Sequence, residues 1–200
     1  TGTGRTSSPT DGCAPFLRAY RYVPSDYWDC TTKTTEYFYN GSILAGQKAG
    51  NDTIIFMYDN NGDIFGFTYN GTPYYYVKNA QNDVVFIVDE TNHIVVYYEY
   101  DAWGKVIYCN DISGFGLASI NPIMYRSYYV DLEMGMYIYY LNSRYYVADW
   151  GRFASADVLV SSEQGMLGYN LFAYCGNNPV MGYDPTGNFA ILTTIDNSFH

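Results

Sequence analysis

A short turn unit recurs along this chain and constrains its fold more than any other feature. It reads Tyr-Asp-x-x-Gly-x-apolar at residues 58–64, 100–106 and 183–189, and a weaker copy with the Asp displaced by one place covers residues 147–153. In such a unit the Asp side chain accepts backbone hydrogen bonds, and the Gly takes the positive φ that closes the turn. Repetition of a turn unit predicts repetition of a hairpin. The residues expected to make these turns are Asp59, Gly62, Asp101, Gly104, Gly151 and Gly187.

The stretches between the turns have the length and composition of strands. Aromatic residues make up 20% of the 200 residues and charged residues only 15%, and aromatic side chains suit a pleated, half-buried surface. One hairpin cannot bury its aromatic face, whereas stacked hairpins can. We therefore expect an all-β fold of tandem antiparallel hairpins in an extended, curling sheet. A β-sandwich with similar turns by chance is the alternative architecture.

Two parts of the chain depart from this strand pattern. Residues 1–35 are rich in small polar residues without sustained alternation, which predicts a linker or an incomplete repeat. At most one or two short helices are expected, with one short turn or helix around residues 167–174. It should end before Asn177-Asn178-Pro179, because the residue before a proline is pushed out of helical geometry.

The charge balance and the hydropathy pattern exclude two classes of partner. Acidic residues outnumber basic ones by 20 to 10 and prevail in both halves of the chain. Binding nucleic acid requires positive charge to neutralise phosphates, so we expect no nucleic-acid partner. No apolar run approaches the roughly 20 residues needed to cross a bilayer, so no membrane span is expected. The first residues carry neither an initiator Met nor a signal pattern, and we expect a soluble piece of a longer protein.

Metal and cofactor chemistry find no recognisable motif. The cysteines form no Cys-x-x-Cys pair and the histidines are isolated, so we expect no metal site and no cofactor. The sequence is compatible both with two disulfides and with four buried thiols. The residues concerned are Cys13, Cys30, Cys109, Cys175, His93 and His200.

Several segments occur in an order typical of one protein family. They are residues 74–79 (YYYVKN), 97–104 (YYEYDAWG), 143–146 (SRYY), 151–157 (GRFASAD), 168–174 (GYNLFAY), 177–180 (NNPV) and 184–187 (DPTG). On these motifs, residues 36–187 resemble the YD-repeat proteins of the RHS family, and the second half is similar to the RHS repeat-associated core domain.

The resemblance implies a scaffold of a bacterial polymorphic toxin. YD repeats in this family spiral into a hollow β-cocoon, the core region plugs one end, and a variable toxin follows Asp-Pro-x-Gly. The expected organisation is a linker or incomplete repeat at residues 1–35, hairpins of the curved shell wall at 36–110, the core plug at 111–187, and the start of a truncated variable region at 188–200. An isolated piece of such a shell would expose strand edges, so we expect it to self-associate or to be marginally stable.

The resemblance also implies partners and a location. The partners would be a C-terminal effector in cis and upstream YD repeats. The protein would be secreted or delivered at the bacterial cell surface.

In several members of the family the core cuts its own chain just after Asp-Pro-x-Gly, using two aspartates. Carried over to this sequence, the pair is Asp157 and Asp184, and the cut falls between Asn188 and Phe189. Two carboxylates held close cannot both ionise, so one acts as acid while the other activates water. Asp184, which precedes a proline, is also expected at a turn as a backbone cap.

The sequence departs from the self-cutting pattern near these aspartates. Val158 stands where those members have Pro, and Asn188 stands where Leu is common. Arg144 and Arg152 are candidates to support the pair or to stabilise charge in the transition state. Alternatively, the arginines of this half, which include Arg126, pair across strands with the acidic residues Asp131, Glu133 and Asp149.

A carbohydrate-binding β module is the alternative function, because sugar faces stack on Tyr and Trp rings, and cell-surface glycans would then be partners. Its candidates are Trp28, Trp103 and Trp150, although the last two precede a turn Gly and are expected to pack on neighbouring turns. A glycosidase needs two carboxylates beside an aromatic platform, but the glutamates sit in no recognisable motif. They are Glu36, Glu90, Glu99, Glu133 and Glu163.

Overall fold

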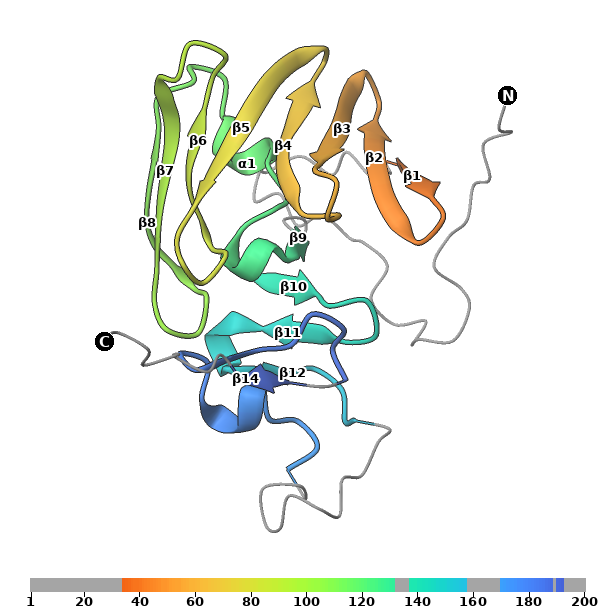
Figure 1. The fold of residues 1–200 in the computed structure, drawn as a ribbon, viewed down its shortest axis with the longest axis vertical. Coiled ribbons are helices and arrows are strands. Elements are labelled where there is room, and N and C mark those ends of the chain that lie inside the picture. The colour runs from red at the N-terminus through yellow and green to blue at the C-terminus, as the bar shows by residue number, and fades with distance from the viewer. Residues whose placement is uncertain (1–33, 132–136, 158–169, 189, 193–200) are drawn as a thin grey trace, which may run out of the picture.

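One large antiparallel sheet dominates the structure. The computed structural model describes residues 34–131, 137–157, 170–188 and 190–192 (Figure 1). The sheet has eight strands, and each strand pairs with its neighbours in the chain. This confirms the prediction of an all-β fold of tandem antiparallel hairpins. The strands are β1 (Thr35–Asn40), β2 (Ile43–Ala49), β3 (Asp52–Tyr58), β4 (Ile64–Tyr69), β5 (Thr72–Lys78), β6 (Val84–Val88), β7 (Ile94–Tyr100) and β8 (Val106–Asp111).

After β8 the chain forms a smaller second part: in Figure 1, α1 lies at the height of the large sheet, whereas β11, β12 and β14 lie below it. It contains a four-stranded antiparallel sheet in the order β12-β11-β10-β9 and the two-stranded sheet β13-β14. None of the helices in the described ranges has the length and apolarity needed to span a bilayer. The elements are α1 (Leu117–Ile120), η1 (Tyr125–Ser127), β9 (Tyr129–Asp131), β10 (Ile138–Tyr140), β11 (Tyr145–Val147), η3 (Ala148–Trp150), β12 (Arg152–Phe153), η5 (Cys175–Asn177), β13 (Gly182–Tyr183) and β14 (Ile191–Leu192).

Of the short turn or helix expected around residues 167–174, the described part is a turn and not a helix. Residues 167–169 lie outside the described ranges, and residues 170–174 form a turn followed by an isolated bridge between Ala173 and Arg152. Backbone N–H groups of Phe153 and Asp157 donate to carbonyls of this segment at 2.9 and 2.8 Å. Pairing with a distant strand therefore overrides the local preference.

The turn residues Asp59 and Asp101 close two hairpins in the same way. Each carboxylate oxygen Oδ1 accepts the backbone N–H groups two and four residues further on, at 2.8 to 2.9 Å. Gly62 and Gly104 follow with φ of +86° and +89°. The side chain thus replaces the ladder partners that the chain loses where it reverses.

Two further turns use the same arrangement with different residues. Asn79 and Asp89 accept the corresponding N–H groups at 2.8 to 3.0 Å, and Asn82 and Asn92 take the positive φ. Asn is among the few residues with a side chain that tolerates this conformation. The sequence motif missed both turns because it required Tyr at the first place and Gly at the fifth, where these turns have Lys78 or Val88 and an Asn.

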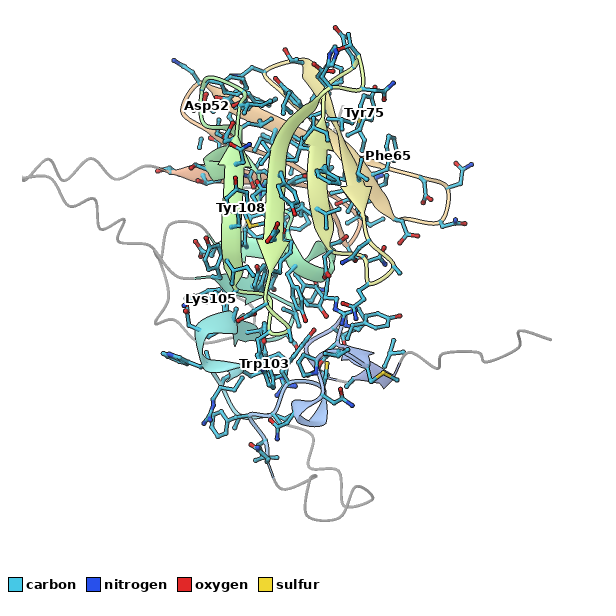
Figure 2. All side chains as sticks on the ribbon, turned by 90° about the vertical axis from the view of Figure 1, so that its left-hand side faces the viewer. Asp52, Phe65, Tyr75, Trp103, Lys105 and Tyr108 are labelled. Carbon is cyan, nitrogen blue, oxygen red and sulfur yellow. The ribbon has the colours of Figure 1, made fainter. Side chains whose placement is uncertain are left out.

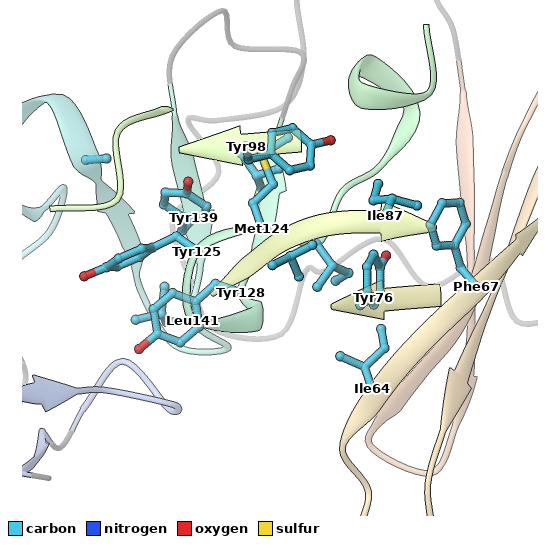
Figure 3. Close-up of a cluster of buried hydrophobic side chains, with 14 of the residues drawn as sticks. Ile64, Phe67, Tyr76, Ile87, Tyr98, Met124, Tyr125, Tyr128, Tyr139 and Leu141 are labelled. Carbon is cyan, nitrogen blue, oxygen red and sulfur yellow. The ribbon is translucent and has the colours of Figure 1, made fainter. Parts of the chain in front are cut away.

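Alternate residues of the large sheet face a shared core. Figure 3 shows Phe67, Tyr76 and Ile87 of the sheet beside Met124 and Tyr125 from the chain after β8. Residues on the opposite face, such as Phe65, Tyr75 and Tyr108 in Figure 2, point away from that core. The second part of the chain therefore covers the inner face of the sheet, and burial of each large side chain stabilises the fold by about 1.5–3 kcal/mol. The buried residues that the two parts contribute include Ile54, Phe56, Ile64, Phe67, Tyr74, Tyr76, Val84, Ile87, Val96, Tyr98, Leu117, Ile123, Met124, Tyr125, Tyr128, Val130, Tyr139 and Tyr146.

The turn between β7 and β8 joins the two parts. Three successive carbonyls of this turn, those of residues 102, 103 and 104, each accept a tyrosine hydroxyl from the second part. The donors are Tyr125 at 2.9 Å, Tyr146 at 2.7 Å and Tyr139 at 2.7 Å. Gly104 lies so close to the Tyr125 ring that a Cβ would be 2.5 Å from it. The turn therefore fixes where the small sheet sits below the large one.

Candidate functional site

The structure brings Asp157, Asp184 and Arg144 together. Nη2 of Arg144 lies 2.8 Å from Oδ2 of Asp157 and 3.8 Å from Oδ2 of Asp184. Arg144 precedes β11, Asp157 follows β12, and Asp184 follows β13. Arg144 is 7% exposed and Asp184 only 2% exposed. Three separate segments thus place two carboxylates around one buried guanidinium.

Arg144 is held on all sides. Its Nη1 donates to the carbonyl of Leu171 at 3.1 Å, and its Nε donates to the carbonyl of Gly187. The guanidinium carbon lies 3.6 Å from the centre of the Phe153 ring, a cation–π arrangement. Burial lowers the pKa of Arg144, and the two neighbouring carboxylates oppose that shift. An arginine stays protonated in proteins, so the site keeps one fixed positive charge.

Asp184 uses its two carboxylate oxygens differently. Oδ1 accepts the backbone N–H groups of Gly187 at 2.8 Å and of Thr186 at 3.2 Å, which is the expected turn cap. Oδ2 faces Arg144. The backbone N–H of Asp184 donates to the hydroxyl of Tyr128 at 2.8 Å. The role as a cap and the place beside Arg144 are therefore compatible.

The Asp-Pro-Thr-Gly segment is docked on the loop that precedes β11. The carbonyl of Thr186 accepts the backbone N–H of Ser143 at 3.2 Å and its hydroxyl at 2.6 Å. Nδ2 of Asn142 donates to the carbonyl of Pro185 at 3.1 Å. Gly187 has φ +74°, and a Cβ there would lie 2.7 Å from Oγ of Ser143. Only glycine fits this close approach at this backbone conformation.

The expected cut follows this docked segment directly. The N–H of Asn188 donates to Oγ1 of Thr186 at 3.4 Å, whereas Phe189 and Val158 lie outside the described residues. Strands β13 and β14 pair Gly182 with Leu192, so the segment forms a hairpin loop.

Arg152 is not brought to the two aspartates. It is exposed on β12, and no ion pair joins it to Asp157 or Asp184. Of the pairings expected as the alternative, Arg126 instead lies 3.8 Å from Asp83, and Asp149 pairs with Lys105 at 2.6 Å. These partners come from turns of the large sheet, and sequence distance gave no indication of them. Glu133 lies outside the described residues.

The two sugar-binding candidates that the structure describes, Trp103 and Trp150, have different surroundings. The ring of Trp103 packs on Gly151, where a Cβ would lie 3.0 Å from it, as the packing of neighbouring turns predicts. Trp150 is 58% exposed, and Trp28 lies outside the described residues. Within the described ranges, no group of three potential metal ligands occurs, and Cys109 and Cys175 are free thiols.

Sequence reasoning missed two contributors to the site. Tyr128 and the loop before β11 both contact the Asp-Pro-Thr-Gly segment. A tyrosine in a chain with 25 of them carries no distinguishing signal. The SRYY segment at residues 143–146 marked the loop, but only as part of a resemblance.

Comparison with known proteins relates the sequence to toxins. The chain is 36% identical to the tRNA3(Ser)-specific nuclease WapA of Bacillus spizizenii over 79% of its length, and 36% identical to the tRNA nuclease WapA of Bacillus subtilis over 80%. The toxin protein Tse5 of Pseudomonas aeruginosa is 40% identical over 37% of the chain. The chain is homologous to a segment of each of these bacterial proteins. It spans 7% of the length of each of these WapA proteins and 5% of Tse5. No family model matches it.

Solved structures share its fold. A crystal structure of TcdB2-TccC3-Cdc42 covers 78% of this chain with a TM-score of 0.61 and 20% identity, and the chain covers 8% of it. The Photorhabdus luminescens Tc holotoxin pore covers 80% with a TM-score of 0.54 and 17% identity, and the chain covers 9% of it. At these identities the likeness establishes the fold alone.

Proposed function

We propose that this chain is a piece of an RHS-type toxin shell that encloses and presents a C-terminal effector in cis. Residues 36–110 would form shell wall, residues 111–187 the core plug, and residues 188–200 the start of the effector region. The homology to WapA and Tse5 supports this, together with the curved hairpin sheet and its likeness to the TccC3 complexes. The effector is a part that would differ between such proteins, so its activity does not follow from these residues.

The edges of the large sheet support a continuing wall. β1 and β8 form its two edges among the described strands, and an unpaired edge is a template for a further strand. β1 would pair with upstream YD repeats, and residues 1–35 would belong to an incomplete repeat or a linker. The shell would act outside the producing cell, as a secreted or surface-delivered bacterial protein.

The same piece would cut its own chain between Asn188 and Phe189. The observation that carries this proposal is the buried meeting of Arg144, Asp157 and Asp184 beside the Gly187 carbonyl, one residue before the expected cut. Hydrolysis by this pair would need one proton shared between the two carboxylates, and with that proton the guanidinium and the carboxylates together are neutral. That proton makes one carboxyl an acid while the other stays a base.

The reaction would be a single-turnover hydrolysis. Water attacks the carbonyl carbon of Asn188, and one carboxylate takes a proton from the water. The protonated carboxyl gives its proton to the nitrogen of Phe189 as the peptide bond breaks. The products are a carboxyl group on Asn188 and an amino group on Phe189. Arg144 would stabilise the negative charge that develops in the transition state. Its hydrogen bond to the carbonyl of Gly187 would hold the residue that precedes Asn188 in place.

Mass spectrometry of the chain fused after His200 to an inert folded reporter tests self-cleavage. We expect the unmutated chain to release the reporter with Phe189 at its new N-terminus. Asp157→Asn and Asp184→Asn should slow release by at least about 100-fold, because each removes one partner of the proton transfer. Asp149→Asn is the matched control, since Asp149 contacts surface Lys105 instead of the site. Equal release from all four chains would refute the aspartate pair, and an uncut parent chain would refute self-cleavage.

A further inference from the structure

A pair of buried tyrosine hydroxyls lies beside the main chain of Asp184. The hydroxyl of Tyr128 accepts the backbone N–H of Asp184 at 2.8 Å and lies 3.1 Å from the hydroxyl of Tyr174. Tyr128 is 7% exposed and Tyr174 fully buried. No step of the hydrolysis described above uses either side chain.

The hydrogen bond between Asp184 and Tyr128 has a fixed direction, whereas either tyrosine hydroxyl can be the donor in the bond between the two tyrosines. A backbone N–H can only donate, so Tyr128 must use an oxygen lone pair for Asp184. Its own hydrogen is then available to the oxygen of Tyr174. Burial raises the pKa of both phenols above the usual range, so both stay neutral. The pair therefore holds a position and moves no charge.

The chain around Tyr128 is fixed to both sides of the site. Arg126, two residues earlier, donates its backbone N–H to Asp83 of a large-sheet turn at 2.9 Å and its Nη2 to the carbonyl of Pro179 at 2.5 Å. Tyr174 stacks on Tyr146 with ring centres 4.1 Å apart, and β11, which contains Tyr146, begins directly after the arginine of the site. Tyr128 is thus anchored to the shell wall as well as to the strand behind that arginine.

We propose that Tyr128 is a positioning residue for self-cleavage: its hydroxyl holds the Asp184 main chain so that the Asp184 carboxylate faces Arg144. This inference rests on the proposed self-cleavage. Without the hydroxyl, the buried N–H of Asp184 loses its acceptor, and the turn rotates or shifts to find another one. A shift of about 1 Å in a reacting group can slow a reaction by roughly 100-fold.

The test compares Tyr128→Phe with Tyr76→Phe in the reporter fusion. Tyr76 is a similarly buried tyrosine of β5 whose hydroxyl donates at 2.7 Å to Asn121, the residue after α1, so it controls for general loss of stability. We expect release by Tyr128→Phe to be slower by roughly 10- to 100-fold and release by Tyr76→Phe to match the parent. The pH at which the rate is half-maximal should move in Tyr128→Phe alone, because the carboxylate has moved relative to the guanidinium.

Tyr174→Phe is the second variant, and circular dichroism checks the folding of each chain. It keeps the hydroxyl of Tyr128 but removes its anchor, so release should be slowed less than in Tyr128→Phe and more than in Tyr76→Phe. If Tyr128→Phe does not fold, the release rates of Tyr174→Phe and Tyr76→Phe test the positioning role on their own. Release at the Tyr76→Phe rate, or an unmoved pH profile in a folded Tyr128→Phe, overturns the positioning role and leaves self-cleavage standing. An uncut parent chain overturns both.

Discussion

Gly62 and Gly104 occupy the same place in two turns of one kind, but their surroundings differ. Their φ angles are +86° and +89°. A Cβ on Gly62 would meet nothing within 4 Å, whereas a Cβ on Gly104 would lie 2.5 Å from the Tyr125 ring. The shared motif explains the backbone conformation of both glycines. Only the fold explains why one of them is also pressed against the second part of the molecule.

Alanine substitution at these two glycines separates backbone strain from packing. Gly62→Ala should lower the free energy of unfolding by about 1–2 kcal/mol, the cost of a left-handed residue with a side chain. Gly104→Ala should add about 1–3 kcal/mol to that cost, because the Tyr125 ring has to move. Urea denaturation of each variant measures the difference. Equal losses would show that the turn is not pressed against Tyr125.

Single residues also mark the limit of sequence reasoning at the site. Asp157 and Asp184 were named from a resemblance and Arg144 as an arginine that could support them, and the three meet in the structure. Arg152 was named on the same grounds and remains at the surface. The side chain of Arg152 points to solvent from the two-residue strand β12. No sequence pattern encodes the direction of a side chain on so short a strand.

At the scale of elements, the turn between β7 and β8 is the joint on which the site depends. Its carbonyls bind three tyrosines of the second part, and the small sheet behind them contains the strand that follows Arg144. At the surface, Lys105 of the same turn also forms an ion pair with Asp149 of the second part, at 2.6 Å. The buried hydrogen bonds should contribute more stability than the exposed ion pair, because water screens the latter.

Tyr139→Phe and Lys105→Ala compare these two kinds of contact. Tyr139→Phe leaves the buried carbonyl of Gly104 without its donor at 2.7 Å and should lower the free energy of unfolding by about 1–3 kcal/mol. Lys105→Ala should leave the unfolding midpoint unchanged within error. Thermal or urea unfolding of both variants checks the order. A larger effect of Lys105→Ala would place the joint at the surface ion pair instead of the buried carbonyls.

The elements themselves were predictable to the extent that local chemistry sets them. Asp-x-x-Gly turns and aromatic stretches predicted tandem hairpins, and the large sheet has them in chain order. The turns at Asn79 and Asp89 escaped because Asn can replace either key residue. The bridge between residues 170–174 and β12 was not predicted, because it pairs Ala173 with a residue far away in the chain. Contacts between segments far apart in the chain are what the local pattern leaves open.

For the whole molecule, the tyrosine-rich core should make the free energy of unfolding fall at alkaline pH. Burial raises the pKa of Tyr145 to about 12 and shifts the pKa of Tyr125, Tyr139 and Tyr146 upward as well. The unfolded chain ionises these phenols near pH 10, while the folded chain keeps them protonated. The unfolded state therefore binds fewer protons above that pH.

Stability should be fully present below pH 10 and fall as the pH rises through the folded pKa values. Phenolate absorbance and circular dichroism followed together should show one steep alkaline transition, in which the buried tyrosines ionise as the sheet signal is lost. The exposed tyrosines titrate earlier and without a change in the sheet signal. Smooth titration of all tyrosines with the fold retained would show that water reaches these phenols in the folded chain, and would contradict their burial.

The most direct measurement on the central claim is the mass of the N-terminal product in heavy-oxygen water. The reporter fusion is incubated in this water, and the fragment is weighed intact. We expect a fragment that ends at Asn188 with one heavy oxygen in its new carboxyl group, because water attacks that carbonyl. An intact chain, a fragment with another end, or a fragment without heavy oxygen would contradict it.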